Sequence, residues 1–408
     1  MKIKLTDPLF KQAIPLLNLI ESHGYEAYFV GGCVRDILLG KKIGDIDIAT
    51  SAFPQEVQEI FPKHFDVGLE HGTVVVLFED QTYEVTTFRT ESTYSDYRRP
   101  DQVDFVRSLE EDTLRRDFTV NAMAVDGRGQ VYDFHGGLED LHSGVLRAVG
   151  VPHQRFEEDA LRMMRGLRFS SQLGFAIERN TLEAICLLAE NLRYISIERT
   201  RIELEKMMMG LHLDQALPLF RQTQLASYFP SGDHLYYVQG LQYIVDQTPK
   251  IEKVASLVWT LLFQGMGLED ERDRRSLMKA WTLSNQMIAQ VEELISLSQV
   301  IQETEIGPLD LYGYSAMSIK LQVALLQNLG RDELAQRLSK SYASLPIYDR
   351  SDLKINGKII IDYLKLSKGG PIIGQLLDQL EKEVLLGQVA NESQALLDSL
   401  KLLTAKED

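Results

Sequence analysis

The stretch GGCVRDILLGKKIGDIDIAT, residues 31–50, decides how the N-terminal part of this chain is interpreted. A pair of glycines turns the chain into a short predicted helix, and Asp45–Thr50 follows as a predicted strand. Asp45 and Asp47 are two positions apart on that strand, so we expect their side chains to leave the same face. Because two neighbouring carboxylates repel each other and are poor core residues, this pattern favours a site for a divalent cation. Hard oxygen ligands indicate Mg²⁺.

The residues around the two aspartates predict a phosphate site. Gly32 lets the backbone approach a ligand, and the N-terminus of the following helix offers free N–H groups. Arg35 lies in the first turn of that helix and adds charge-assisted contacts. Glu84, on a predicted hairpin strand, is a candidate third carboxylate for two-metal chemistry. Each short motif alone is more often an ordinary turn, but their close succession favours a triphosphate–metal site.

Composition and the absence of other motifs narrow the function classes. The 408 residues carry a net charge of −16, are 44% hydrophobic and include two cysteines. These values predict a multi-domain globular protein of the reducing cytoplasm, without a disulfide framework or a membrane span. The sequence contains neither the P-loop pattern nor a dinucleotide-binding glycine fingerprint. Taken alone, the acidic charge argues against nucleic-acid binding.

The charge is distributed unevenly along the chain. Residues 1–140 contain 14 basic and 25 acidic residues, whereas residues 141–215 contain ten of each, and nine of those ten cations are arginines. Strand patterns also stop near residue 141 and amphipathic helical patterns take over. The sequence therefore predicts an α+β protein, with a mixed sheet of about five strands followed by helices alone. The expected segments are 1–140, 141–215, 216–330 and 331–408.

Two further motifs, RRDFTVNAMA (115–124) and EEDALRMMRGLRF (157–169), carry a family resemblance. Together with residues 31–50, they make the chain resemble the polymerase-β-like nucleotidyltransferase superfamily. More narrowly, it resembles class II tRNA nucleotidyltransferases and bacterial poly(A) polymerases, and its C-terminal half resembles the CCA-adding enzymes of Gram-positive bacteria. The resemblance implies a nucleotidyltransferase head, a nucleobase-reading neck, and a helical body and tail that hold tRNA, in the order of the four segments above.

The resemblance also implies roles for individual residues. The expected Mg²⁺ ligands are Asp45 and Asp47, with Glu84 as a further acidic catalytic residue. The positions that match phosphate-contacting residues are Gly32, Arg35 and Arg116. In the neck, the expected base-reading pair is Asp159 and Arg162, Glu158 orients that arginine, and the further nucleotide-contacting residues are Arg165 and Arg168.

The neck pair also has a physical rationale. Asp159 and Arg162 are three residues apart on one predicted helix, Glu157–Leu173, and can share a face. A carboxylate accepts from an exocyclic amino group and a guanidinium donates to a ring nitrogen, so cytosine and adenine satisfy the same pair. Uracil and guanine place a carbonyl opposite the carboxylate and are rejected. A salt-bridged, solvated helix face is the alternative interpretation.

The function expected from these observations is template-independent, Mg²⁺-dependent addition of the 3′-terminal CCA to tRNA, using CTP and ATP and releasing pyrophosphate. The polar stretch Ser92–Arg107 is predicted to be a surface loop, which in the family is coupled to the switch from C to A addition. The alternatives are a poly(A) polymerase, an enzyme adding only CC or only A, and a non-catalytic RNA-binding relative. Partners are the tRNA acceptor stem and 3′ end. Whether the protein is a monomer or a homodimer is left open.

Overall fold

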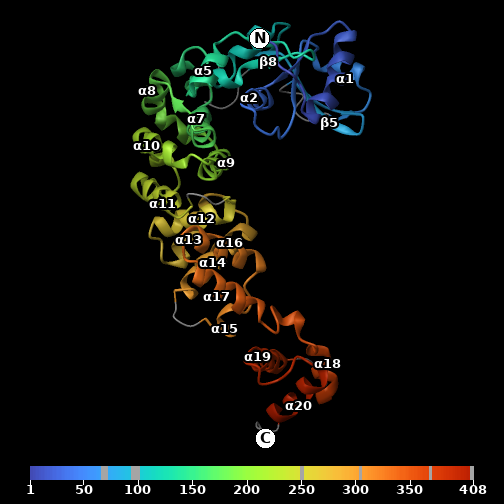
Figure 1. Ribbon diagram of the computed structural model, residues 1–408, viewed down its shortest axis with the longest axis vertical. Helices are drawn as coiled ribbons and strands as arrows, with labels where there is room; N and C mark the ends of the chain where they lie inside the picture. The colour runs from blue at the N-terminus through green and yellow to red at the C-terminus, as the bar shows by residue number, and fades with distance from the viewer. Residues whose placement is uncertain (66–71, 93–101, 249–251, 303–305, 367–369, 405–408) are drawn as a thin grey trace. The chain divides into compact units, whose positions relative to one another are not determined.

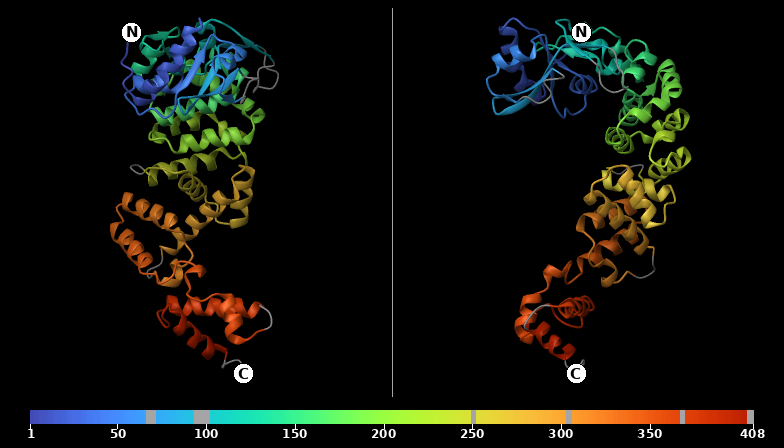
Figure 2. Two further views of the ribbon diagram at one scale, coloured as in Figure 1. Left: turned by 90° about the vertical axis from the view of Figure 1, so that its right-hand side faces the viewer. Right: turned by 180° about the vertical axis from the view of Figure 1, so that it is seen from behind.

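The structure, a computed structural model, describes residues 1–65, 72–92, 102–248, 252–302, 306–366 and 370–404 (Figure 1). The chain forms two compact units. Unit 1 contains residues 1–242 and 280–282, and unit 2 contains residues 243–279 and 283–408. All strands of the described residues belong to unit 1 (Figure 2). The expected α+β class is confirmed.

Unit 1 is built on a seven-stranded mixed sheet with the strand order β3-β4-β5-β2-β1-β8-β9. Only β2 and β5 pair in parallel among these described strands, and the other pairs are antiparallel. The sheet consists of β1 (Ala27–Val30), β2 (Asp47–Thr50), β3 (His64–Phe65), β4 (Thr73–Phe78), β5 (Gln81–Thr87), β8 (Met123–Val125) and β9 (Val131–Asp133).

The sheet is wider than the five strands expected from the sequence. The strand β3 has two residues, and β8 and β9 have three each. The two residues of β3 are too few to display an alternating pattern, so this strand was not expected. The strands β8 and β9 confirm the hairpin that the sequence predicts for Ala122–Val125 and Val131–Asp133, and they extend the sheet because they continue its hydrogen-bond ladder from β1. Two further short pairs lie outside this sheet, β6 (Arg89–Ser92) with β7 (Gln102–Phe105) and β10 (Val145–Leu146) with β11 (Ala176–Ile177). Most of the predicted loop Ser92–Arg107, residues 93–101, lies outside the described residues.

Local signals explain the helices that pack on this sheet. The helix α1 (Pro8–Ser22) begins where Asp7 accepts a hydrogen bond from the Leu9 N–H, and it buries a stripe that includes Phe10 and Leu17. The helix α2 (Gly32–Leu38) follows Gly31, whose φ of 73° favours glycine. The other helices of the head are α3 (Pro54–Ile60), α4 (Leu109–Leu114) and α5 (Gly137–Ser143).

After the sheet, unit 1 continues as helices, in the segment expected to be the neck (141–215) and just beyond it. These helices are α6 (Pro152–Glu158), α7 (Leu161–Leu173), α8 (Arg179–Leu188), α9 (Ile197–Met208) and α10 (Leu213–Thr223), followed by α11 (His234–Gln247), within which the boundary between the two units falls. The helix α7 packs against both α9 and α10. The predicted helix Glu157–Leu173 is divided, because the chain is extended at Asp159 (φ −136°, ψ 104°) between α6 and α7.

The described part of unit 2 is entirely helical. Its elements are α12 (Ala255–Gly265), α13 (Glu271–Ala280), α14 (Asn285–Val300), α15 (Pro308–Leu311), α16 (Ala316–Asn328), α17 (Asp332–Ala343), α18 (Gly357–Leu364), α19 (Pro371–Leu385) and α20 (Ser393–Thr404). Aliphatic side chains such as Leu297, Leu338 and Leu380 form its core. In the part of the chain that the structure describes, no helix is both long and apolar enough to span a membrane.

Candidate active site

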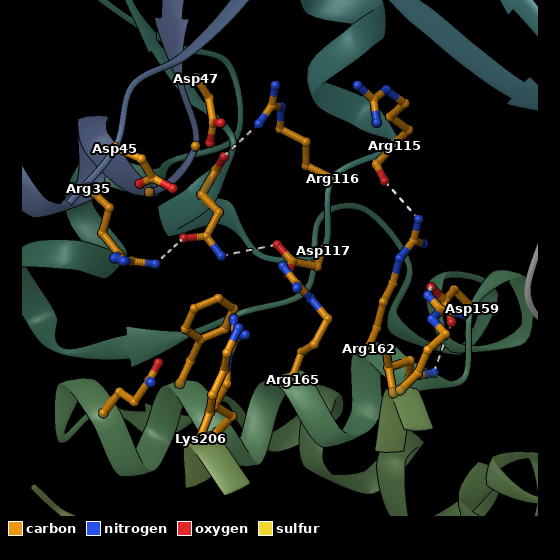
Figure 3. Close-up of a pocket in the computed structure, with 18 of the residues that line it drawn as sticks. Arg35, Asp45, Asp47, Arg115, Arg116, Asp117, Asp159, Arg162, Arg165 and Lys206 are labelled. Carbon is orange, nitrogen blue, oxygen red and sulfur yellow. Dashed lines mark hydrogen bonds and ion pairs between the residues drawn. The ribbon is translucent and has the colours of Figure 1, made fainter. Parts of the chain in front are cut away.

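A cavity of about 900 Å³ lies between the head and the neck within unit 1 (Figure 3). Its volume falls within the range of small-molecule sites. Among the described residues that line it, nine are cationic and four are carboxylates, so the cavity favours an anionic ligand. The lining residues are Gly31, Gly32, Arg35, Asp45, Asp47, Arg89, Arg115, Arg116, Asp117, Asn121, Asp159, Leu161, Arg162, Arg165, Arg168, Phe169, Gln172, Arg199 and Lys206.

The structure therefore brings together most of the residues that the sequence singled out. Nine of the eleven candidate residues line the cavity. Glu84 lines a neighbouring cavity of about 290 Å³, which it shares with Asp45 and Asp47. Glu158 lies behind the wall and contacts a lining residue, Arg162.

The two aspartates differ in their backbone setting. The strand β2 begins at Asp47, and Asp45 precedes it rather than belonging to it, so the expectation that both lie on the strand is wrong. Both side chains nevertheless line the same cavity, and Figure 3 shows them close together. Burial raises the pKa of Asp47, the charges of Asp45 and Glu84 raise it further, and Arg116 opposes them.

The carboxylates of this cavity fit a divalent metal that is completed by ligand oxygens. Within the described residues, no three His, Cys, Asp or Glu side chains are gathered closely enough to hold a metal by themselves. The carboxylates of Asp45 and Asp47 do line one cavity. Burial and then repulsion from Asp45 and Glu84 raise the pKa of Asp47, and a bound cation would relieve both effects. Two hard carboxylate ligands with space for a ligand's own oxygens fit Mg²⁺, which is usually held by one or two carboxylates plus phosphates.

The head supplies two arginines to the cavity. Arg35, from α2, donates from Nη1 to Asn121 Oδ1 at 2.8 Å and pairs with Asp36. Arg116 pairs with the buried Asp112, with Nη2 and Oδ2 3.2 Å apart. A Cβ atom added at Gly31 would lie 3.6 Å from Arg116 Nη1, so the glycine keeps this side of the cavity open.

Asp159 and Arg162, the pair expected to read the base, are held by hydrogen bonds to their neighbours. Arg162 Nη1 donates to Glu158 Oε2 at 2.6 Å, and Nη2 donates to the Arg115 carbonyl oxygen at 2.9 Å. Asp159 Oδ2 accepts from Arg199 Nη2 at 2.9 Å. Because α6 ends at Glu158, Asp159 and Arg162 do not share one continuous helix, contrary to the prediction. The break at Asp159 places its carboxylate in the cavity with Arg162.

The two remaining candidate arginines of α7 are held in ion pairs, in which Arg168 is buried and Arg165 is partly exposed. Arg165 Nε donates to Asp117 Oδ2 at 2.7 Å, and Arg168 Nη1 lies 3.1 Å from Glu203 Oε2. Burial raises the pKa of Asp117, but Arg165 and Asn121 outweigh it and lower that pKa to about 2. Arg162 and Arg168 are each 7% exposed, so they do not belong to a solvated helix face.

One wall of this cavity, formed by α9, was not predicted from the sequence. Arg199 and Lys206, on α9, line it, and Glu203 on the same helix pairs with Arg168. These three positions are spaced four and three residues apart, which puts them on one helical face and could have indicated their common role. Phe169 also lines the cavity, although its position within the RGLRF sequence was interpreted only as part of a motif.

Three family models match the chain. Residues 27–147 match the poly A polymerase head domain, residues 174–235 match the "probable RNA and SrmB- binding site of polymerase A", and residues 251–400 match the putative tRNA nucleotidyltransferase domain 2. The first and second matches cover most of unit 1, and the third covers most of unit 2.

Relatives and a solved structure match nearly the whole chain. The CCA-adding enzyme of Enterococcus faecalis is 45% identical over 406 residues, which is 100% of this chain and 99% of the relative. The CCA-adding enzyme of Lactiplantibacillus plantarum is 46% identical over 401 residues, 97% of this chain and 96% of the relative. The chain is also similar to the crystal structure of the Bacillus stearothermophilus CCA-adding enzyme in complex with CTP, with a TM-score of 0.83 and 36% sequence identity. The match covers 98% of this chain and 99% of the Bacillus stearothermophilus chain.

Proposed function

Since the chain belongs to the family of CCA-adding enzymes, as its resemblance predicted, we propose that it completes the 3′ end of tRNA. The reaction is template-independent addition of CMP, CMP and AMP from CTP and ATP, with release of pyrophosphate. The observation that carries the proposal is that Asp159 and Arg162 line the same cavity as Asp45 and Asp47.

The two ends of the cavity have different tasks. At the neck end, Asp159 accepts from the amino group of cytosine or adenine, and Arg162 donates to the neighbouring ring nitrogen. The contacts of Arg162 with Glu158 and of Asp159 with Arg199 fix the spacing of the pair before a nucleotide arrives. Uracil and guanine would leave a buried charge opposite a carbonyl, which costs several kcal/mol.

At the head end, Asp45 and Asp47 would hold Mg²⁺, with Glu84 beside them. When bound, the metal supplies Lewis acidity toward the reacting phosphate and the primer 3′-hydroxyl. The chain's own residues bind and orient the nucleotide: Gly32 gives access to the backbone, and Arg35 and Arg116 neutralise the triphosphate. Arg165 and Arg168 add charge between the two ends.

The division into a head (1–140), a neck (141–215), a body (216–330) and a tail (331–408) remains our proposal, with tRNA held by the body and tail. The chain's net charge of −16 gives no broad cationic surface. Binding therefore relies on shape and on the local cations of the cavity, and we expect modest affinity for arbitrary RNA. We place the activity in the cytoplasm, where tRNA is processed.

Pyrophosphate release with single nucleotides tests the proposal. A tRNA lacking CCA should release two equivalents with CTP alone, and a tRNA ending in CC should release one with ATP alone. UTP and GTP should release none. A poly(A) polymerase would release more than one equivalent of pyrophosphate with ATP. A CC-adding enzyme would release none from the tRNA ending in CC, and a non-catalytic RNA-binding relative would release none from either tRNA.

A further inference from the structure

Three guanidinium groups surround the aromatic ring of Phe169. The Cζ atoms of Arg168, Arg35 and Arg165 lie 4.0, 5.2 and 5.4 Å from the ring centroid. Arg35 comes from α2 of the head, whereas the other two come from α7 of the neck, and Figure 3 shows Arg35 and Arg165 reaching into the cavity from these two elements. The ring is therefore shared by cations from both parts of the site.

These cations are costly to gather without a ligand. Burial lowers the pKa of Arg168 to about 10, and the neighbouring charges of Arg165 and Arg35 contribute to the decrease. Carboxylates offset the charge only in part, because four of them face nine cations among the described lining residues. In addition, Arg168 Nε is buried without a hydrogen-bond partner among the described residues. The side chain of Arg168 is 8% exposed and lines the cavity. A buried, unpartnered donor in a cationic cavity indicates that an anion completes the site.

An aromatic ring and a carboxylate attract a guanidinium group in different ways. A carboxylate occupies N–H donors, which a substrate phosphate would then have to displace. An aromatic face attracts the cation through its quadrupole and leaves the N–H groups at the edge of the guanidinium available. Phe169 is itself fixed, since it is 5% exposed and makes an edge-to-face contact with Phe118 at a centroid distance of 5.9 Å.

We propose that Phe169 is a positioning residue whose ring keeps Arg35, Arg165 and Arg168 together as a preformed cluster for the triphosphate of the incoming nucleotide. This inference rests on the proposed function. Among the described residues, the cations over the ring are Arg35, Arg165 and Arg168 and do not include Arg162. Phe169 therefore governs nucleotide affinity and leaves the choice of base to Asp159 and Arg162. The expected signature is a raised KM for CTP and ATP with the same discrimination against UTP.

The test replaces Phe169 with mono-, di- and trifluorophenylalanine, because fluorine weakens the negative ring face and changes the shape little. Phe53 is the matched control: its ring lies 3.8 Å from Arg107 Cζ, but it does not line the cavity. KM and kcat for CTP and ATP and the Kd of inorganic pyrophosphate are measured for both series, with Tm as the measure of stability. The variant Phe169→Leu removes the ring altogether.

We expect KM to rise with each fluorine, reaching about tenfold in the trifluoro variant and in Phe169→Leu, with kcat within about twofold. The Kd of pyrophosphate should rise in parallel, whereas the Phe53 series should change neither. Nucleotide and pyrophosphate affinities that are independent of fluorination would overturn the inference, as would an equal effect in the Phe53 series. If the unmodified protein added no nucleotide, the proposed function would fail, but the pyrophosphate series would still decide the role of Phe169.

Discussion

Glu84 lies directly opposite Asp47 across the parallel pairing of β5 with β2. A parallel pair cannot be joined by a tight hairpin, so β3, β4 and α3 lie between the two strands in the sequence. This arrangement brings a carboxylate from a distant segment beside the two aspartates, and its charge contributes to the raised pKa of Asp47. The relationship supports the proposal that all three carboxylates act in one reaction.

Replacing Asp45 or Asp47 with asparagine should lower kcat for both CMP and AMP addition by at least about a thousandfold. Each variant loses a proposed metal ligand, and the charge stabilisation that the metal gives the transition state is worth several kcal/mol. Glu84→Gln should have a smaller effect of the same sign. The exposed Asp80 at the β4–β5 turn provides a control, Asp80→Asn. Single-turnover incorporation of each nucleotide measures the effect. Near-normal incorporation by the Asp47 variant would show that the metal assignment is wrong.

The contact between Glu158 and Arg162 should govern base selection. In Glu158→Gln, Arg162 loses a charge-assisted partner, so we expect the ratio of kcat/KM for CTP over UTP to fall about tenfold. Glu157→Gln is the matched control, since Glu157 is exposed and pairs with His153 instead. An unchanged ratio in Glu158→Gln, or an equal fall in Glu157→Gln, would contradict this role.

The sequence pointed to the candidate residues that lie in short motifs, but not to the cavity wall that α9 supplies. Asp45, Asp47, Asp159 and Arg162 were singled out because short spacings bring them together, and Glu158 was singled out by the family resemblance. Arg199 was not, because it reaches Asp159 from α9, and only packing of α9 on α7 creates that contact. The interruption of the helix at Asp159 was also missed, since no glycine or proline marks it. Its extended backbone is stabilised by tertiary contacts rather than by local propensity.

The ion pair between the buried Asp117 and the partly exposed Arg165 should make stability depend on acid pH. The pKa of Asp117 in the folded state is about 2, below its ordinary value of 3.8. The pair therefore contributes fully above about pH 4 and loses its contribution as the pH falls toward 2, a change of roughly 2 kcal/mol in the free energy of unfolding. Denaturant unfolding from pH 5 downward should show a shallower decline in Asp117→Asn than in the unmodified protein. If the free energy of unfolding fell equally steeply with pH in both proteins, the Asp117–Arg165 pair would make no such contribution. The control variant Asp80→Asn should show the same pH dependence as the unmodified protein.

Gly31 should be intolerant of a side chain. Its φ is 73°, and an added Cβ would lie 3.4 Å from Asp47 Oδ2. We expect Gly31→Ala to lower the free energy of unfolding by roughly 1–2 kcal/mol and kcat/KM by about tenfold or more, because the methyl group would lie against Asp47, which we propose as a metal ligand. Gly374→Ala in α19, where an added Cβ meets nothing within 4 Å, should leave activity unchanged. Full activity of Gly31→Ala would show that the site does not require a glycine at position 31.

The fold shows a similar division between local and tertiary information. The α1 helix and the β4–β5 hairpin could be predicted because capping, periodicity and turn residues agree there. The edge strand β3 could not, because His64 and Phe65 become a strand only by pairing with β4. The change from mixed sheet to helices near residue 141 was predictable because it accompanies a change in charge and in hydrophobic period.

The most direct test of the central claim is sequencing of the product 3′ ends at single-nucleotide resolution. A tRNA transcript lacking its last three nucleotides is incubated with the protein, Mg²⁺ and all four nucleoside triphosphates. We expect extension to stop after C, C and A, with neither U nor G incorporated. A run of adenylates, a product ending in CC, or no extension would contradict it.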